Sequence, residues 1–189
     1  MTGKTHRIIG LTVGVGYFLA SSAAIYQPAT LGAVIVASYL GSLMPDADDA
    51  GADIWHTIPL GHSVGKISDP LLKHRNISHS IVGIGIYAYL IYLLLKSFPS
   101  YWSIEIEPVV IASSIAYGSH LLADSLTVEG IPVFWPWKRM FGIPPQPFDG
   151  IRIQTGKWFE NLVIFPAINV ILIIIIASLW DKIKSIIYR

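Results

Sequence analysis

A histidine and an aspartate end the long apolar segment around residue 120, and their spacing suits the binding of a cation. His120 and Asp124 are four residues apart, so on a helix they lie on one face, one turn apart. At that spacing, an imidazole nitrogen and a carboxylate oxygen can bind the same metal ion. A hydrogen bond between the two side chains at a helix end is the alternative, and this pair alone does not distinguish the two.

Further residues of the same chemical types lie at the ends of other apolar segments or between them. His6 precedes the first apolar segment, Asp46 follows the second and Glu160 opens the last. His74 and His79 do not have a one-face helical spacing, so we expect His74 in a loop and His79 in a first helical turn. The helix dipole alone would also favour a glutamate in a first turn. The predicted metal ligands are His6, Asp46, His74, His79, His120, Asp124 and Glu160.

These nitrogen and oxygen donors determine which ion and which reaction we expect. The set exceeds the four ligands of one tetrahedral zinc, so we predict one or two divalent ions, with zinc favoured. Such ions activate water and stabilise charge on a phosphoryl or acyl oxygen. Asp46, Glu160 and Arg75 are the candidate catalytic residues, and Arg75 and Lys157 are candidates for binding a substrate phosphate. Asp48 is an alternative ligand to Asp46, although a solvated acidic turn would also explain it.

The composition indicates a membrane protein. The 189 residues are 53% hydrophobic and only 13% charged, whereas soluble domains carry about 25% charged residues. A net charge of +1 without a basic stripe gives no support for nucleic-acid binding. There is no cysteine, which excludes disulfides and thiolate metal sites.

Five apolar segments predict an all-α, polytopic transmembrane helical bundle that forms a single domain over residues 1–189. They cover residues 8–26, 29–44, 79–95, 108–123 and 158–180. Two long polar loops, 45–78 and 124–157, would then lie on one side of the membrane together with most candidate ligands. Lysine and arginine are more frequent on that side, which favours a cytoplasmic site, although the basic tail after residue 180 argues against it.

Four motifs resemble the YdjM-like family, which is described as LexA-regulated, membrane-bound, metal-dependent hydrolases. They are Thr5-His6, Pro45-Asp46-x-Asp48, His74-Arg75-x-x-Ser78-His79-Ser80 and Gly118-Ser119-His120-Leu121-Leu122-Ala123-Asp124-x-x-Thr127. The order of the motifs is also similar to that of the zinc-dependent phospholipase C and P1-nuclease group. This similarity implies zinc ligands at His6, Asp46, His74 or His79, His120 and Asp124. The chain departs from that group because it lacks a later His-x-x-x-Glu pair, and Gly156 stands four residues before Glu160.

These observations lead to one principal hypothesis and two alternatives. We expect an integral protein of the inner membrane that hydrolyses a phosphoester of a lipid or lipid-linked substrate, with the bilayer and that substrate as its partners. A metal-binding membrane protein without turnover, such as a sensor, carrier or assembly factor, is the main alternative. A carrier would place its ligands near the middle of the bilayer, whereas these lie towards one face. The second alternative is a purely structural membrane protein.

Overall fold

The computed structural model describes residues 1–21, 27–49, 51–57, 77–98 and 102–188, and within these ranges the chain is all-α, as predicted. The helices are α1 (Gly3–Ala20), α2 (Pro28–Gly41), α3 (Asp53–Thr57), α5 (Ile81–Lys96), α6 (Ile106–Ser125), α7 (Phe165–Ser178) and α8 (Trp180–Ile187). Three short 3-10 helices are η2 (Met44–Asp48), η3 (Ile77–His79) and η5 (Phe148–Ile151), and a π-helical stretch, η6 (Glu160–Ile164), leads into α7. The described residues contain two isolated β-bridges and no strand.

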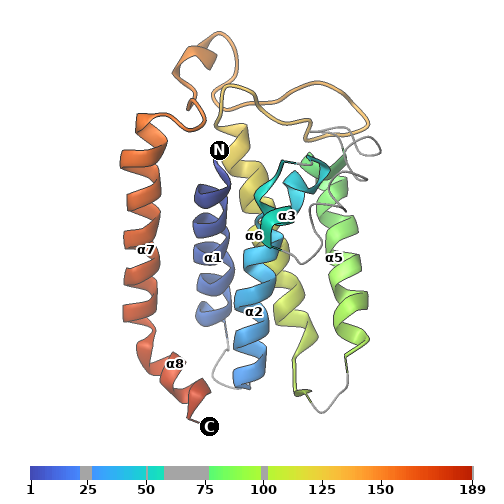
Figure 1. The fold of residues 1–189 in the computed structure, drawn as a ribbon, viewed down its shortest axis with the longest axis vertical. Coiled ribbons are helices and arrows are strands. Elements are labelled where there is room, and N and C mark those ends of the chain that lie inside the picture. Colours follow the sequence, from blue (N-terminus) through green and yellow to red (C-terminus); the bar gives the residue numbers. More distant parts are fainter. Residues whose placement is uncertain (22–26, 50, 58–76, 99–101, 189) are drawn as a thin grey trace.

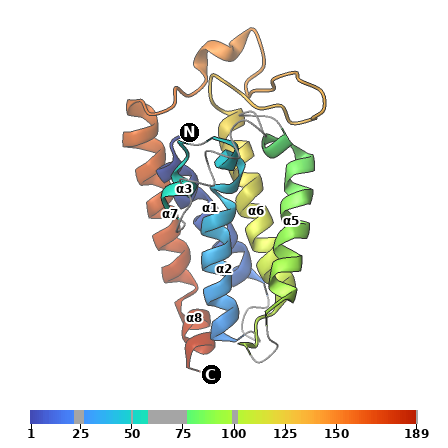
Figure 2. The same ribbon diagram turned by 45° about the vertical axis from the view of Figure 1, so that its right-hand side comes forward.

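Helix α6 is the centre of the bundle. It packs against α1, α2 and α5, while α7 packs along the outer side of α1 (Figures 1 and 2). Small residues allow the close approach of these helices. A Cβ atom on Gly41 would lie 2.6 Å from the Ser113 carbonyl oxygen, so a larger residue would push α2 away from α6. The main apolar core lies among α1, α2, α6 and α8 and comprises Val15, Phe18, Leu19, Leu31, Val34, Ala37, Val109, Ala112 and Ile186.

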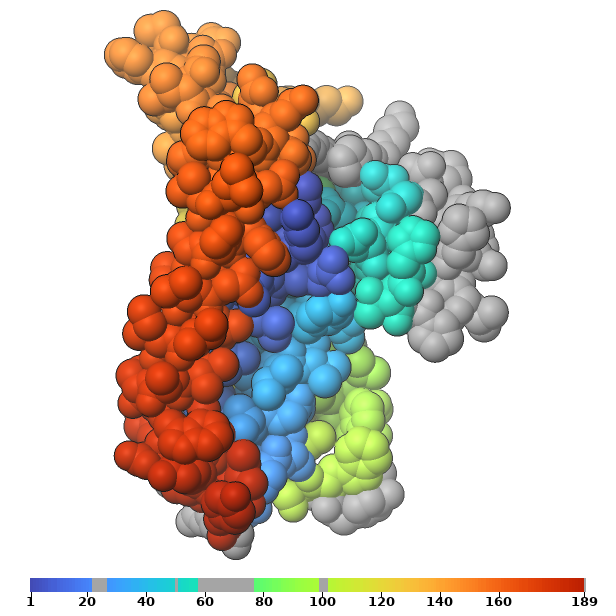
Figure 3. All heavy atoms as spheres, turned by 60° about the vertical axis from the view of Figure 1, so that its left-hand side comes forward, coloured from blue at the N-terminus to red at the C-terminus, as the bar shows by residue number. Residues whose placement is uncertain are grey.

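Two helices in the described ranges are long and apolar enough to cross a membrane. They are Ile106–Ser125, half of whose apolar window is buried, and Glu160–Ser178, whose window has no buried residue. Pro28–Gly41 and Ile81–Lys96 are shorter apolar helices. Figure 3 shows the last helices running along the outside of the bundle. Two of the described helices are therefore able to cross a membrane by length and composition, while the crossing of five spans stays a prediction.

The chain between α6 and η6 crosses one end of the bundle, beyond the N-terminus of α1 (Figure 1). A parallel bridge joins Thr127 to Ile153, and an antiparallel bridge joins Ile131 to Phe141. Gly130 has a φ of +67°, and a Cβ atom there would lie 2.5 Å from the Phe141 carbonyl oxygen, so glycine is required at this turn. This segment was expected as a long polar loop, and it forms the cover over the site end of the bundle.

Candidate metal centre

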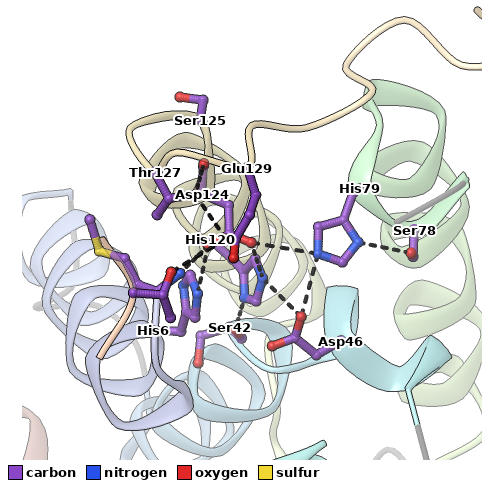
Figure 4. Close-up of polar contacts among 12 residues, drawn as sticks. His6, Ser42, Asp46, Ser78, His79, His120, Asp124, Ser125, Thr127 and Glu129 are labelled. Carbon is purple, nitrogen blue, oxygen red and sulfur yellow. Dashed lines mark hydrogen bonds and ion pairs between the residues drawn. The ribbon is translucent and has the colours of Figure 1, made fainter. Parts of the chain in front are cut away.

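Four side chains from three elements converge at the end of the bundle that this loop covers (Figure 4). Asp46 comes from η2, His79 from η3, and His120 and Asp124 from the last turns of α6. One ligand atom from each residue lies within 4.8 Å of all the others. Asp46 follows Pro45 within η2, after the end of α2 at Gly41, and His79 precedes α5, so both side chains come from short turns outside the apolar helices. The i, i+4 spacing on α6 supplies the remaining two.

The distances within this cluster suit a metal ion with tetrahedral coordination. Asp46 Oδ1 lies 3.4 Å from both His79 Nε2 and His120 Nε2. Asp124 Oδ2 lies 3.8 Å from His79 Nε2 and 3.7 Å from His120 Nε2. Ligands about 2.1 Å from a zinc ion at tetrahedral angles are about 3.4 Å apart. The buried Nε2 of His120 has no hydrogen-bond partner among the described residues. The donor set and this orphaned nitrogen therefore fit a divalent cation.

The second nitrogen of each histidine is held by a neighbouring group. His120 Nδ1 is 2.7 Å from the Ser42 carbonyl oxygen, which only accepts, so Nδ1 donates and the Nε2 lone pair faces the cluster. His79 Nδ1 is 3.1 Å from Ser78 Oγ and 3.8 Å from Asp48 Oδ2. The Ser78 hydroxyl donates to Asp48 at 2.5 Å. Asp48 is fully buried, so the structure places it behind His79 and not in a solvated acidic turn.

The charges of the two turn residues depend on each other. Burial opposes ionisation of Asp46, but the imidazoles of His120 and His79, each with Nε2 3.4 Å from Asp46 Oδ1, favour the charged form and lower the pKa of this carboxyl. Burial also disfavours the charged form of His79, but hydrogen bonds and charge from Asp46 and Asp48 raise its pKa to about 9. Without a cation, the carboxylates are thus neutralised in part by a proton on His79. A bound metal ion would take over that role.

Solvent reaches the cluster from the side of Asp46. The Asp46 side chain is 26% exposed, whereas the side chains of His79, His120 and Asp124 are at most 3% exposed. The site is therefore a largely closed centre with one carboxylate at its edge. This leaves the Asp46 side as the approach for a small molecule.

His6 borders the cluster through Asp124. Its ring stacks on that of His120, with centroids 3.5 Å apart, and its Nε2 lies 3.0 Å from Asp124 Oδ1. The amino group of Met1 also contacts Asp124 Oδ1. Asp124 thus presents one oxygen to the four-residue cluster and the other to α1. His6 lies beside the four-residue cluster and outside it, so its role as a metal ligand stays a prediction.

Glu160 and Lys157 lie outside the four-residue cluster. Glu160 accepts hydrogen bonds from the backbone N–H and hydroxyl of Thr2 at 2.7 and 2.6 Å, and from the N–H of Gly156 at 2.7 Å. It lies outside the four-residue cluster and ties η6 to the start of α1, so its metal-binding and catalytic roles stay predictions. Lys157 is exposed near the same turn. His74 and Arg75 lie outside the described residues.

One acidic residue near the cluster was not among the predicted residues. Glu129 belongs to the loop that follows α6, and Figure 4 shows its side chain extending from that loop towards the cluster. Glu129 Oε2 lies 3.5 Å from Thr127 Oγ1, and the same hydroxyl donates to the Asp124 carbonyl oxygen at 2.7 Å. No local sequence pattern marks a glutamate in a polar loop as a site residue. Its position five residues after Asp124 was the only feature that would have nominated Glu129 as a candidate.

Comparison with known proteins agrees with a membrane protein. The chain belongs to the YdjM inner membrane protein family, whose profile matches residues 1–183. It is 31% identical over 114 residues to the inner membrane protein YdjM of Escherichia coli K12 and to that of Shigella flexneri. These matches cover 59% of this chain and 53% of each relative, so the chain matches about half the length of these YdjM proteins.

A second relative is matched over more of its length. The chain is 26% identical over 164 residues to the uncharacterized protein YvsG of Bacillus subtilis 168, covering 87% of this chain and 88% of that protein. No solved structure matches the chain. The family membership confirms the resemblance seen in the motifs and supports a location in a membrane.

Proposed function

We propose that this chain is an integral membrane, metal-dependent hydrolase that acts on a phosphoester of a lipid or lipid-linked substrate. The observation that carries the proposal is the buried cluster of Asp46, His79, His120 and Asp124, whose four ligand atoms lie within 4.8 Å of one another. The cluster lies at the end of an apolar bundle, where an amphiphilic substrate would meet it. A mixed set of imidazole and carboxylate donors favours zinc among the divalent ions.

Each residue near the cluster has a role in this proposal. The four cluster residues would hold the ion, while the Ser42 carbonyl fixes the tautomer of His120. A bound divalent ion supplies Lewis acidity, which activates water and stabilises negative charge on a phosphoryl oxygen. Asp46, at the exposed edge, would both hold the ion and orient the incoming water. Arg75, Lys157 and Glu160 stay candidates for phosphate binding and proton transfer.

The membrane arrangement is part of the same proposal. We propose that α1, α2, α5, α6 and the helix containing α7 all cross the bilayer, with the cluster at the cytoplasmic face. The support is the gathering of Asp46, His79, His120 and Asp124 at one end of the bundle, and the basic residues predicted on that side. A reporter fused after Arg189 should then be read outside the cytoplasm. A reporter found in the cytoplasm would contradict the proposed number of spans or their proposed direction.

The central experiment combines metal analysis with an activity screen. The protein is purified in detergent, its metal content is measured by mass spectrometry, and hydrolysis is tested on phospholipids and on a soluble aryl phosphodiester. The same measurements are made on His120→Ala, on Asp124→Asn and on the control His56→Ala, whose exposed histidine lies outside the cluster. We expect bound metal and turnover in wild type and control, and loss of both in the two cluster variants. Equal metal content in all four proteins would refute the site.

A second function is favoured by the depth of burial of the centre. Three of the four side chains are nearly inaccessible to solvent, which suits an ion that is held and not exposed to substrate. We propose a non-catalytic metal-binding membrane protein as this alternative. Bound metal that depends on His120, together with no turnover on any phospholipid or phosphodiester, would favour it over the hydrolase.

A further inference from the structure

An apolar cavity of about 510 Å³ lies beside the metal centre, on a neighbouring face of α6. Its walls come from the start of α5, the end of α6 and the loop that follows α6, and include Ile84, Leu122, Val133, Phe134 and Ile143. Leu122 is 60% exposed although it lies next to a buried turn of α6, so the apolar wall is open to the surroundings. Ser125, which follows the cluster residue Asp124, also lines it.

The roof of this cavity is fixed by backbone hydrogen bonds. The N–H of Ile81, at the start of α5, donates to the Val133 carbonyl oxygen at 3.1 Å, and the N–H of Ile143 donates to the Ser125 carbonyl oxygen at 2.7 Å. Ile131 and Phe141 exchange two backbone hydrogen bonds of 2.8 Å between them. The loop is therefore attached to both helices, and the cavity is formed before any ligand arrives. A preformed apolar cavity binds a ligand without the cost of ordering the loop.

A polar cavity of about 560 Å³ borders the apolar one. The two share Phe141, Gly142 and Pro145, and the polar cavity is lined by charged side chains of both signs: Glu129, Arg139, Asp149 and Arg152. Arg152 donates to the carbonyl oxygens of Gly142 and Pro144, so it holds the loop. Arg139 has no hydrogen bond or ion pair with the described residues beyond its contact with the Phe141 ring, and its guanidinium can bind an anion. Glu129 connects this cavity to the metal centre through Thr127.

We propose that the apolar cavity binds an acyl chain of a membrane phospholipid, with the phosphate-bearing head group in the polar cavity. Three observations select this occupant. The cavity is lined by aliphatic and aromatic carbon, it opens among exposed apolar side chains of α5 and α6, and it borders a cavity that contains an arginine available to a phosphate. The inference rests on the proposed function for the reaction, but lipid binding itself does not require turnover.

Photocrosslinking tests lipid binding independently of activity. The full-length protein in detergent is labelled with a phosphatidylglycerol that carries a diazirine on its acyl chain, and the labelled residues are mapped by mass spectrometry. We expect labelling of Leu122, Val133 and Ile143, removed by excess unlabelled long-chain phosphatidylglycerol but not by its dihexanoyl analogue. Labelling that is not displaced, or that is confined to the outer face of α7, would overturn the proposal.

A matched pair of substitutions separates the cavity from the general apolar surface. Leu122→Trp fills the cavity from an exposed position, whereas Leu93→Trp makes the same change on α5, away from the cavity lining. We expect displaceable labelling to be about tenfold weaker in Leu122→Trp. A tenfold change corresponds to about 1.4 kcal/mol, which is similar to the free energy of removing two methylene groups from an apolar site. Leu93→Trp should behave as wild type. Ile143→Trp, on the loop side, provides a second variant with the same expectation as Leu122→Trp.

The outcomes distinguish this inference from the proposed function. Turnover of a soluble phosphodiester that depends on His120, with no displaceable labelling, would keep the hydrolase and reject the lipid site. Displaceable labelling reduced in Leu122→Trp, without turnover of any phosphodiester, would keep the lipid site and reject the hydrolase. If Leu122→Trp instead converts a dimer into a monomer in light scattering, a second copy of the chain occupies the cavity and the lipid site is rejected.

Discussion

Loss of His120 should abolish the stabilisation of this protein by metal. The His120 ring supplies one of four ligand atoms, its Nδ1 is already used by the Ser42 carbonyl, and its buried Nε2 has no other hydrogen-bond partner in the described ranges. An ion supplied at about 100 times its dissociation constant stabilises the folded state by about 2.7 kcal/mol. For a chain of this size, that corresponds to a rise in melting temperature of about 5–10 °C.

Removing a direct ligand should cost more than the 10- to 100-fold loss of affinity that is typical for residues behind a ligand. At the same metal concentration, a loss of about 100-fold leaves about 0.4 kcal/mol of stabilisation, and the shift falls below about 2 °C. Melting of His120→Ala is followed with zinc and with a chelator, so that any cavity left by the ring affects both measurements equally. Asp46→Asn should behave in the same way, and His56→Ala should keep the full shift. A full shift in His120→Ala would refute the four-residue site.

Three further results are expected. Asp48→Asn weakens the buried support of His79 through Ser78, so zinc affinity in titration calorimetry should fall about 10- to 100-fold while the fold is kept. His79 carries a proton below about pH 9 in the metal-free protein, so metal binding must displace this proton; affinity should therefore fall about tenfold for each pH unit below 9, with proton release visible in buffers of different ionisation enthalpy. Lys182→Met removes two hydrogen bonds of 3.0 and 3.3 Å to carbonyls at the end of α1, which should cost about 1 kcal/mol of stability in thermal melting without changing the metal-dependent shift.

Much of the candidate site could be predicted because its residues follow from local patterns. The spacing of His120 and Asp124 and the positions of Asp46 and His79 at the ends of apolar segments need no tertiary information. The all-α class followed from the apolar segments in the same way. The partners of these residues could not be predicted, because they are distant in sequence. Glu160, for example, meets Thr2 158 positions away, and an acid at the start of a helix looks the same with or without such a partner.

The end of α2 shows how one local feature creates two parts of the site. Pro45 has no backbone N–H, so α2 cannot continue past it as a regular helix. The N–H of Asp46 bonds to the Leu43 carbonyl oxygen at 3.2 Å, within η2, in place of the Ser42 carbonyl that a continued α-helix would use. The Ser42 oxygen is thereby left for His120 Nδ1. The same turn directs the Asp46 carboxylate towards His120 Nε2 at 3.4 Å. The turn that contains Pro45 therefore positions both the ligand Asp46 and the Ser42 carbonyl that orients His120.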